Sequence, residues 1–263
     1  PPPRCGRRGT ILTRPPLPPI AMPAATSPIR RADLVESIAA ALQYISYYHP
    51  ADYIAHLARA YEREQGPAAK DAIAQILTNS RMCAEGKRPI CQDTGIVNVF
   101  LDVGMDVRWE GFNGGTIDDA VNEGVRRAYL DPDNKLRGSV VADPLFSRKN
   151  TKDNTPAVVS MKVVPGDKLG VGVAAKGGGS EMKSNFEMLK ASDSLVEWVL
   201  KTVPKMGAGW CPPGMLGIGV GGTAEKAMAM AKEALMDDID MFDLKQRGPK
   251  TDVEKLRVEL YEK

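Results

Sequence analysis

The sequence contains few histidines and carries little net charge. His49 and His56 are its only histidines in 263 residues, which argues against a Ser–His–Asp triad and against a histidine-rich zinc site. A formal net charge of +2 gives no reason to expect a nucleic-acid partner. No apolar run approaches the roughly 20 residues that a membrane-spanning helix needs. We therefore expect a soluble globular protein with neither a nucleic-acid nor a membrane partner.

Cysteine is also scarce. Cys5, Cys83, Cys91 and Cys211 are too few and too scattered for the disulfide framework of a secreted protein. The expected location is therefore a reducing cytoplasm. No two cysteines form a CxxC pair, so a zinc ribbon is not indicated. Cys83 has no supporting motif, and we interpret it as structural.

The two ends of the chain differ from the middle. Residues 1–31 are rich in proline and arginine and contain no acidic residue, which predicts a disordered arm. We interpret residues 1–21, which precede Met22, as an extension that is not native to the protein; a targeting arm is the alternative. Residues 32–263 are expected to form the folded domain. The last predicted helix reaches Lys263 without a capping signal, which suggests that the natural chain continues.

Hydrophobic periodicity predicts a mixed α/β fold in which N-terminal helices lead into a small mixed sheet with flanking helices. Residues 96–103 alternate like a strand, and 157–164 and 168–175, joined by Pro-Gly-Asp, are typical of a β-hairpin. A short strand is expected between Cys211 and Thr223. Helices are expected at 33–48, 51–64, 68–82, 117–130 (with a Thr116/Asp119 capping box), 192–203, after Thr223, and from Thr251 (with a Glu254 capping box).

Two cysteine loops have unusual neighbours. Cys91 lies in "RPICQDTG", followed directly by a carboxamide and a carboxylate, and Cys211 lies in "MGAGWCPPG". Prolines restrict both loops, and glycines would allow the close approach of a bulky group. The residues alone leave two interpretations open, a pair of functional thiols or two buried structural cysteines.

Three further segments have residue types that suit an anion. Consecutive glycines in "AAKGGGSEMK" could direct backbone N–H groups at an anion, although a flexible turn explains them equally well. "GVGGTAEKA" could bind an anion at a helix N-terminus, or Thr223 could be a plain N-cap. Arg137 could hold a carboxylate in its planar fork, or it could be a solvated surface charge.

Four motifs, "RPICQDTG", "RKNTKDNTPA", "AAKGGGSE" and "MGAGWCPPGMLGIGVGGTAEKA", occur in this order. Together they resemble the α (N-terminal) portion of class I, iron–sulfur-dependent fumarate hydratases and the related tartrate dehydratases. The resemblance covers roughly Asp33 to Lys263. It implies reversible hydration of fumarate to malate. The alternatives are dehydration of tartrate or another 2-hydroxy diacid, and a cluster-free, non-catalytic module.

The resemblance also implies a site. Cys91 and Cys211 match two of the three thiolate ligands of a [4Fe–4S] cluster, whose open iron would act as a Lewis acid. The third cysteine ligand and the proposed base would lie beyond the end of this chain. Asp93 is given a catalytic role. The implied substrate contacts are Gln92, Asp93, Arg137, Gly178 and Gly179.

The implied partners follow from the same resemblance. A small dicarboxylate is the expected substrate. The missing C-terminal or β portion is expected either in the same chain or as a separate subunit, and the assembly is expected to be a homo-oligomer. The isolated chain is expected to be inactive.

Overall fold

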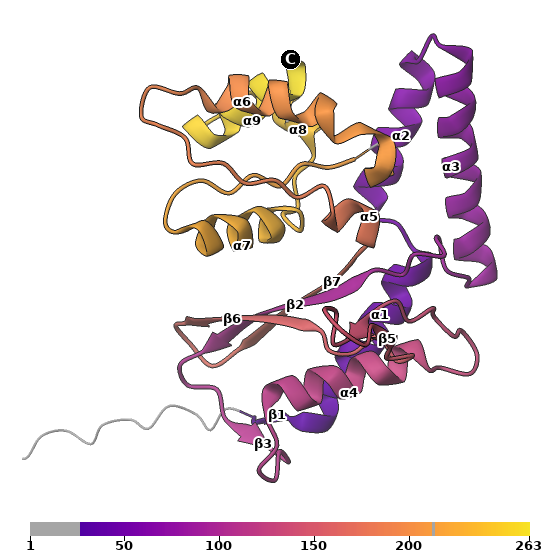
Figure 1. Ribbon diagram of the computed structural model, residues 1–263, viewed down its shortest axis with the longest axis vertical. Helices are drawn as coiled ribbons and strands as arrows, with labels where there is room; N and C mark the ends of the chain where they lie inside the picture. Colours follow the sequence, from indigo (N-terminus) through magenta and orange to yellow (C-terminus); the bar gives the residue numbers. More distant parts are fainter. Residues whose placement is uncertain (1–26, 212–213) are drawn as a thin grey trace, which may run out of the picture.

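The computed structural model describes residues 27–211 and 214–263 (Figure 1). Most of the predicted disordered arm, residues 1–26, lies outside this part of the chain. The predicted arm extended to residue 31, and this C-terminal limit was wrong. Strand β1 (Ile29–Arg30) pairs in parallel with strand β3 (Trp109–Glu110). The Ile29 N–H donates to the Arg108 carbonyl at 2.8 Å, so this pairing orders the segment before the first helix.

The three predicted N-terminal helices are present. They are α1 (Arg31–Tyr47), α2 (Ala51–Arg63) and α3 (Pro67–Gly86). Pro67 stands in the first turn of α3, where its missing N–H costs no intrahelical bond. Helices α2 and α3 lie side by side as an antiparallel pair (Figure 1). None of the helices in the described residues is both long and apolar enough to cross a membrane.

Strand β2 (Ile96–Gly104) is the central strand of a three-stranded sheet. Strand β6 (Val158–Val164) pairs with it in parallel, and β7 (Leu169–Lys176) pairs with its other edge in the antiparallel sense. The predicted hairpin between these two flanking strands was therefore wrong. They are neighbours in sequence but lie on opposite sides of β2.

The connection from β6 to β7 passes around the end of β2. The Gly104 N–H donates to the Lys168 carbonyl and the Met105 N–H to the Val164 carbonyl, each at 2.9 Å. Two strand spacings amount to about 10 Å, which a short extended connection can span. The crossing is tight, because a Cβ on Gly104 would lie 2.3 Å from the Gly166 carbonyl oxygen. This close approach requires glycine.

The hydrophobic core lies between β2 and two helices, α1 and α4 (Ile117–Tyr129), which cover one face of the sheet (Figure 1). Alternate residues of β2 point into it, as expected for a strand that is buried on one face. Each fully buried aliphatic side chain contributes about 1.5–3 kcal/mol relative to an exposed one. The buried residues of this core are Leu34, Val35, Ile38, Leu42, Val97, Val99, Leu101, Ala120, Val121, Val125, Ala128, Tyr129 and Leu136.

The remaining elements complete a mixed α/β fold, as predicted. The capping boxes at Thr116 and Thr251 are both formed, whereas Thr223 precedes its helix without a side-chain capping bond in the described residues. The remaining elements are β4 (Val141–Ala142), β5 (Lys149–Asn150), α5 (Gly178–Glu181), α6 (Leu195–Thr202), the 3₁₀ helix η1 (Val203–Trp210), α7 (Ala224–Ala234), α8 (Met241–Arg247) and α9 (Asp252–Glu262).

The short strand predicted before Thr223 is absent from the described residues 214–220. This segment runs against α7 instead of against another strand. A Cβ on Gly217 would lie 2.0 Å from the Ala231 carbonyl oxygen, and one on Gly219 would lie 2.0 Å from the Ala227 carbonyl oxygen. The alternating glycines therefore allow a close approach to a helix, a contact that the strand-like pattern does not reveal.

Gly124 allows the first stability prediction. A Cβ there would lie 2.8 Å from both Ile38 Cβ and the Val35 carbonyl oxygen, so α1 and α4 would have to separate. Overpacking costs about 1–3 kcal/mol, and alanine recovers about 1 kcal/mol of helix propensity. The net of these terms is a loss of up to about 2 kcal/mol, so we expect Gly124→Ala to lower the free energy of unfolding in urea titrations by as much as that.

Gly86 provides the matched control, because a Cβ there would meet nothing nearer than 3.8 Å. Gly86→Ala should leave the urea midpoint unchanged or raise it slightly. An equal loss of stability in both variants would contradict close packing at Gly124.

Candidate functional site

The loop that carries Cys91 is held at both ends. Helix α3 ends in a left-handed residue, Lys87, at φ 47°. The Ile90 N–H then donates to the Ser46 carbonyl at 2.8 Å, and the Asn79 side chain donates to the Ile90 carbonyl at 3.0 Å. These bonds deliver Cys91, exposed and unoxidised, to the start of β2.

The Cys91 sulfur has two polar neighbours from its own motif. The thiol donates to Gln92 Oε1, and the Asp93 N–H donates to the sulfur, each at 3.4 Å. A cysteine sulfur can act as a nucleophile or as a metal ligand, and here it is exposed with a backbone N–H directed at it. The local geometry therefore suits a ligand or a reactive thiol, and the exposed position contradicts the interpretation of Cys91 as a buried structural cysteine.

The Asp93 carboxylate joins this loop to α5. Its Oδ1 accepts the Gly95 N–H at 3.1 Å, and its Oδ2 accepts the Gly178 N–H at 2.8 Å. The glycine run predicted as an anion-binding segment thus directs one of its N–H groups at a carboxylate of the chain itself. Both carboxylate oxygens are engaged with backbone, so Asp93 fixes the position of α5 relative to Cys91.

Two buried side chains that sequence reasoning did not identify donate hydrogen bonds to the backbone of the Cys91 loop. The Tyr129 hydroxyl donates to the Thr94 carbonyl at 2.7 Å, and burial raises the pKa of Tyr129 to about 12. The fully buried Asn154 donates to the Gly95 carbonyl at 2.9 Å. Its Oδ1 accepts the backbone N–H of Ser139 at 2.7 Å. Asn154 belongs to the motif "RKNTKDNTPA", which was the only sequence signal for it.

Arg137 is tied to the same loop through its backbone. Its carbonyl accepts the Thr94 hydroxyl. The side chain is exposed, and its guanidinium makes no ion pair with any residue from 27 to 211 or from 214 to 263. The structure therefore places Arg137 beside the Cys91 loop with its charge free.

Cys211 follows a helix that contacts α5. Helix η1 ends at Trp210, and Cys211 itself takes a left-handed conformation at φ 61° with an exposed, unoxidised thiol. Contact with α5 is close, because a Cβ on Gly179 would lie 2.5 Å from the Gly209 carbonyl oxygen. The prolines that follow Cys211 lie outside the described residues. Helix α5 is thus in contact with both cysteine-bearing segments.

Helix α5 is also held by an ion-pair network that the sequence did not predict. Glu181 lies 3.0 Å from Lys176 Nζ on β7 and 2.8 Å from Lys232 Nζ on α7. Burial raises the pKa of Glu181, but the two lysines lower it further than burial raises it, so the net direction is downward. Glu181 therefore stays ionised and links α5 to two neighbouring elements, β7 and α7.

The described residues contain no group of three or more histidine, cysteine, aspartate or glutamate side chains that could hold a metal ion. Both histidines have partners elsewhere: His49 lies 3.0 Å from Ser80 Oγ, and His56 pairs with Asp240 at 3.0 Å. Burial lowers the pKa of His49, which favours its neutral form. Cys91 and Cys211 thus have no third ligating side chain of these types beside them in this part of the chain.

Comparison with known proteins identifies similar sequences. A family model described as Fumarate hydratase (Fumerase) matches residues 35–263. The "Putative L(+)-tartrate dehydratase subunit alpha" of Methanocaldococcus jannaschii is 33% identical over 224 residues, which cover 82% of this chain and 75% of that protein.

Two Escherichia coli proteins are more distant. The "L(+)-tartrate dehydratase subunit alpha" of strain UTI89 is 25% identical over 209 residues, 78% of this chain and 68% of that protein. The "Fumarate hydratase class I, anaerobic" of strain K12 is 29% identical over 168 residues, 62% of this chain but only 30% of that protein. The family match spans all the predicted site residues. The chain therefore belongs to the fumarate hydratase (Fumerase) family.

Proposed function

We propose that this chain forms part of a hydro-lyase that reversibly hydrates fumarate to malate. The observation that carries the proposal is the position of the two motif cysteines. Cys91 and Cys211 are exposed and free, and each lies two residues from a residue that contacts α5, Asp93 after Cys91 and Gly209 before Cys211. Cys83, which is outside the motifs, is buried in α3. Family membership supports the reaction class.

We further propose that these two thiolates hold a [4Fe–4S] cluster. Exposed thiols, one of which accepts a backbone N–H, are suitable donors for such a group. Cysteine thiolates are the right type of ligand for such a cluster, but two are too few, since the described residues offer no third ligating side chain beside them. A third thiolate would have to come from outside this part of the chain. When bound, a cluster with an open iron supplies Lewis-acid chemistry.

The side chains around the cysteines have separate roles in this proposal. Arg137 binds a substrate carboxylate, because its free guanidinium can donate two parallel hydrogen bonds. Gln92 orients substrate beside Cys91, to whose thiol it already hydrogen-bonds. Asp93 positions Gly178, since both carboxylate oxygens accept backbone N–H groups. Gly179 contributes a backbone contact to substrate, and it allows α5 to lie close to η1, because a Cβ there would lie 2.5 Å from the Gly209 carbonyl oxygen.

Tartrate is the second candidate substrate. Two of the similar proteins are named as tartrate dehydratase α subunits, and one of them is 33% identical to this chain. The word "subunit" in those names supports a separate partner subunit for this chain as well. Fumarate and tartrate would share the carboxylate contact at Arg137, so turnover assays with each diacid are needed to distinguish them.

Anaerobic reconstitution with iron and sulfide tests the proposal. The 263-residue chain would be reconstituted with and without the C-terminal portion of a family member, and then assayed with fumarate and with L(+)-tartrate. We expect brown, active protein only when both portions are present. Protein that stays colourless and inactive in both samples would overturn the cluster assignment, and malate formation by the chain alone would overturn the need for a partner.

The cysteine assignments predict a specific pattern of mutations. In the reconstituted assembly, Cys91→Ser and Cys211→Ser should each abolish stable cluster absorbance and turnover, because a hydroxyl is a poor iron ligand. Cys83→Ser is the matched control. Its sulfur only contacts Asn79 Oδ1 and the Pro89 carbonyl, at 3.6 and 3.7 Å, so cluster absorbance should persist. Normal absorbance in either motif variant would remove that residue from the ligand set.

The assignment of Arg137 to a substrate carboxylate predicts a change in substrate binding alone. Arg137→Lys keeps the charge but loses the bidentate geometry, so KM for the diacid should rise at least about tenfold, equivalent to about 1.4 kcal/mol. Cluster absorbance should not change. Arg148→Lys, at another exposed arginine, is the control and should leave KM unaltered. An unchanged KM in Arg137→Lys would show that this arginine does not contact substrate.

A further inference from the structure

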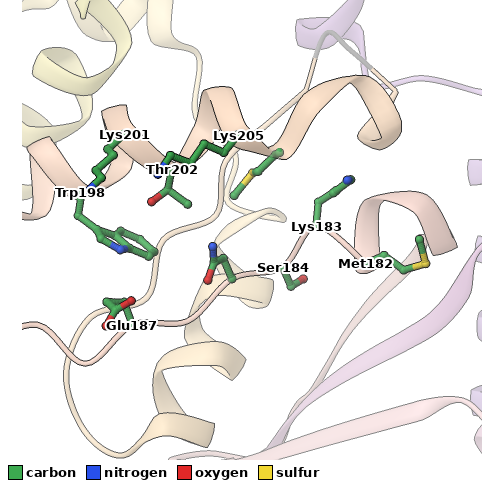
Figure 2. Close-up of a pocket in the computed structure, with 10 residues that line it drawn as sticks. Met182, Lys183, Ser184, Glu187, Trp198, Lys201, Thr202 and Lys205 are labelled. Carbon is green, nitrogen blue, oxygen red and sulfur yellow. The ribbon is translucent and has the colours of Figure 1, made fainter.

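A polar cavity lies beside the segment that leads to Cys211, since Met206 of the motif "MGAGWCPPG" is one of its lining residues. It has a volume of about 450 Å³ and lies between the segment that follows α5 and the helical stretch α6–η1 (Figure 2). None of the residues assigned to the cluster or to substrate lines it. Its lining residues are Met182, Lys183, Ser184, Asn185, Glu187, Trp198, Lys201, Thr202, Lys205 and Met206.

One wall of the cavity is a single helical face. Trp198, Lys201, Thr202 and Lys205 are spaced three, four and seven residues from the first, so they project from the same side of a helix. The stretch continues from α6 into η1, because Val203 keeps helical dihedrals at φ −56° and ψ −47°. This face carries two lysines and an indole toward a cavity, where a packing face would carry aliphatic residues.

The opposite wall adds a third lysine. Figure 2 shows Lys183, Ser184 and Glu187 on the segment that faces α6. A Cβ built on Gly209 would lie 3.2 Å from Lys183 Cε, so the Lys183 stem packs against η1. The cavity is therefore lined by three cationic groups and only one carboxylate, with hydroxyl and amide groups between them.

None of the three lysines forms an ion pair within the described residues, although Glu187 lines the same cavity. Ammonium groups that share a cavity repel one another, and an anion placed among them is attracted by all three. Several lysines elsewhere in this part of the chain, Lys168 among them, also lack an ion pair, so the cavity is distinguished by the grouping of three such lysines around one space; six other lysines pair with carboxylates. These paired lysines are Lys162, Lys176, Lys232, Lys245, Lys255 and Lys263.

We infer that this cavity binds a small polyanion, one that carries two or more carboxylate or phosphate groups. Lys183, Lys201 and Lys205 neutralise its charges, and the Ser184 and Thr202 hydroxyls donate hydrogen bonds to its oxygens. The Trp198 indole covers its apolar portion. None of these side chains is assigned to the cluster or to the diacid substrate, so the inference does not rest on the proposed function.

Calorimetric titration of the 263-residue chain tests this inference, with citrate as the carboxylate probe and pyrophosphate as the phosphate probe at constant low ionic strength. At least one probe should bind with a Kd below about 1 mM and weaken as NaCl is added. The variant Lys201→Gln/Lys205→Gln should weaken binding at least about tenfold. Lys168→Gln/Lys255→Gln, which removes the same charge outside the cavity, should bind like the unaltered protein.

The outcomes are distinct. Tighter binding of citrate or of pyrophosphate identifies the anionic group that the site prefers. Absence of binding by both probes overturns the inference, as does equal weakening in the two double variants. Binding of polyglutamate without binding of either small probe would also overturn it, because the cavity would then be a contact surface for acidic protein. None of these results depends on whether a cluster is present.

Discussion

The structure depends on strand β2, the central strand of the sheet, which needs partners at both edges and on both faces. Its alternate residues Val97, Val99 and Leu101 are buried under α1 and α4, and its two edges are paired by β6 and β7. Its remaining face is directed at the C-terminal helices. Since the Cys91 loop leads directly into this strand, the rigidity of the core is transmitted to the first predicted ligand, and Gly124 sets how closely the covering helices pack.

The loop itself is held by polar side chains that bind backbone. Asp93, Asn154 and Tyr129 each hydrogen-bond main-chain groups of the loop or of a segment beside it. Leaving a buried polar group unpaired costs about 1–3 kcal/mol, so the buried Asn154 and Tyr129 restrain the loop substantially, and the half-buried Asp93 adds to them. These supporting side chains set the shape of the loop, whereas Cys91 and Arg137 take no side-chain part in that support and are exposed. This division between supporting and exposed groups is typical of sites that must hold reactive groups in a fixed geometry.

The lysines near α5 divide into two sets with different environments. Lys176 and Lys232 both pair with Glu181, and this network secures α5 from two neighbouring elements. Lys201 and Lys205 line a cavity that offers a single glutamate, with which neither pairs. The lysines that secure α5 are therefore compensated within the chain, whereas the cavity lysines form no ion pair in the described residues and suit the anion that we infer.

Local features followed from the sequence alone: the apolar spacing of α1, the capping boxes at Thr116 and Thr251, and the mixed α/β class. Each depends on residues within one or two turns of one another. The hairpin prediction was wrong because strand pairing is decided by β2, a segment far away in the chain. The supports of the Cys91 loop were missed for the same reason, since Asn154 reaches Gly95 across 59 residues. The motifs marked which residues matter, but only tertiary folding decided which of them meet, because long-range contacts leave no local periodicity.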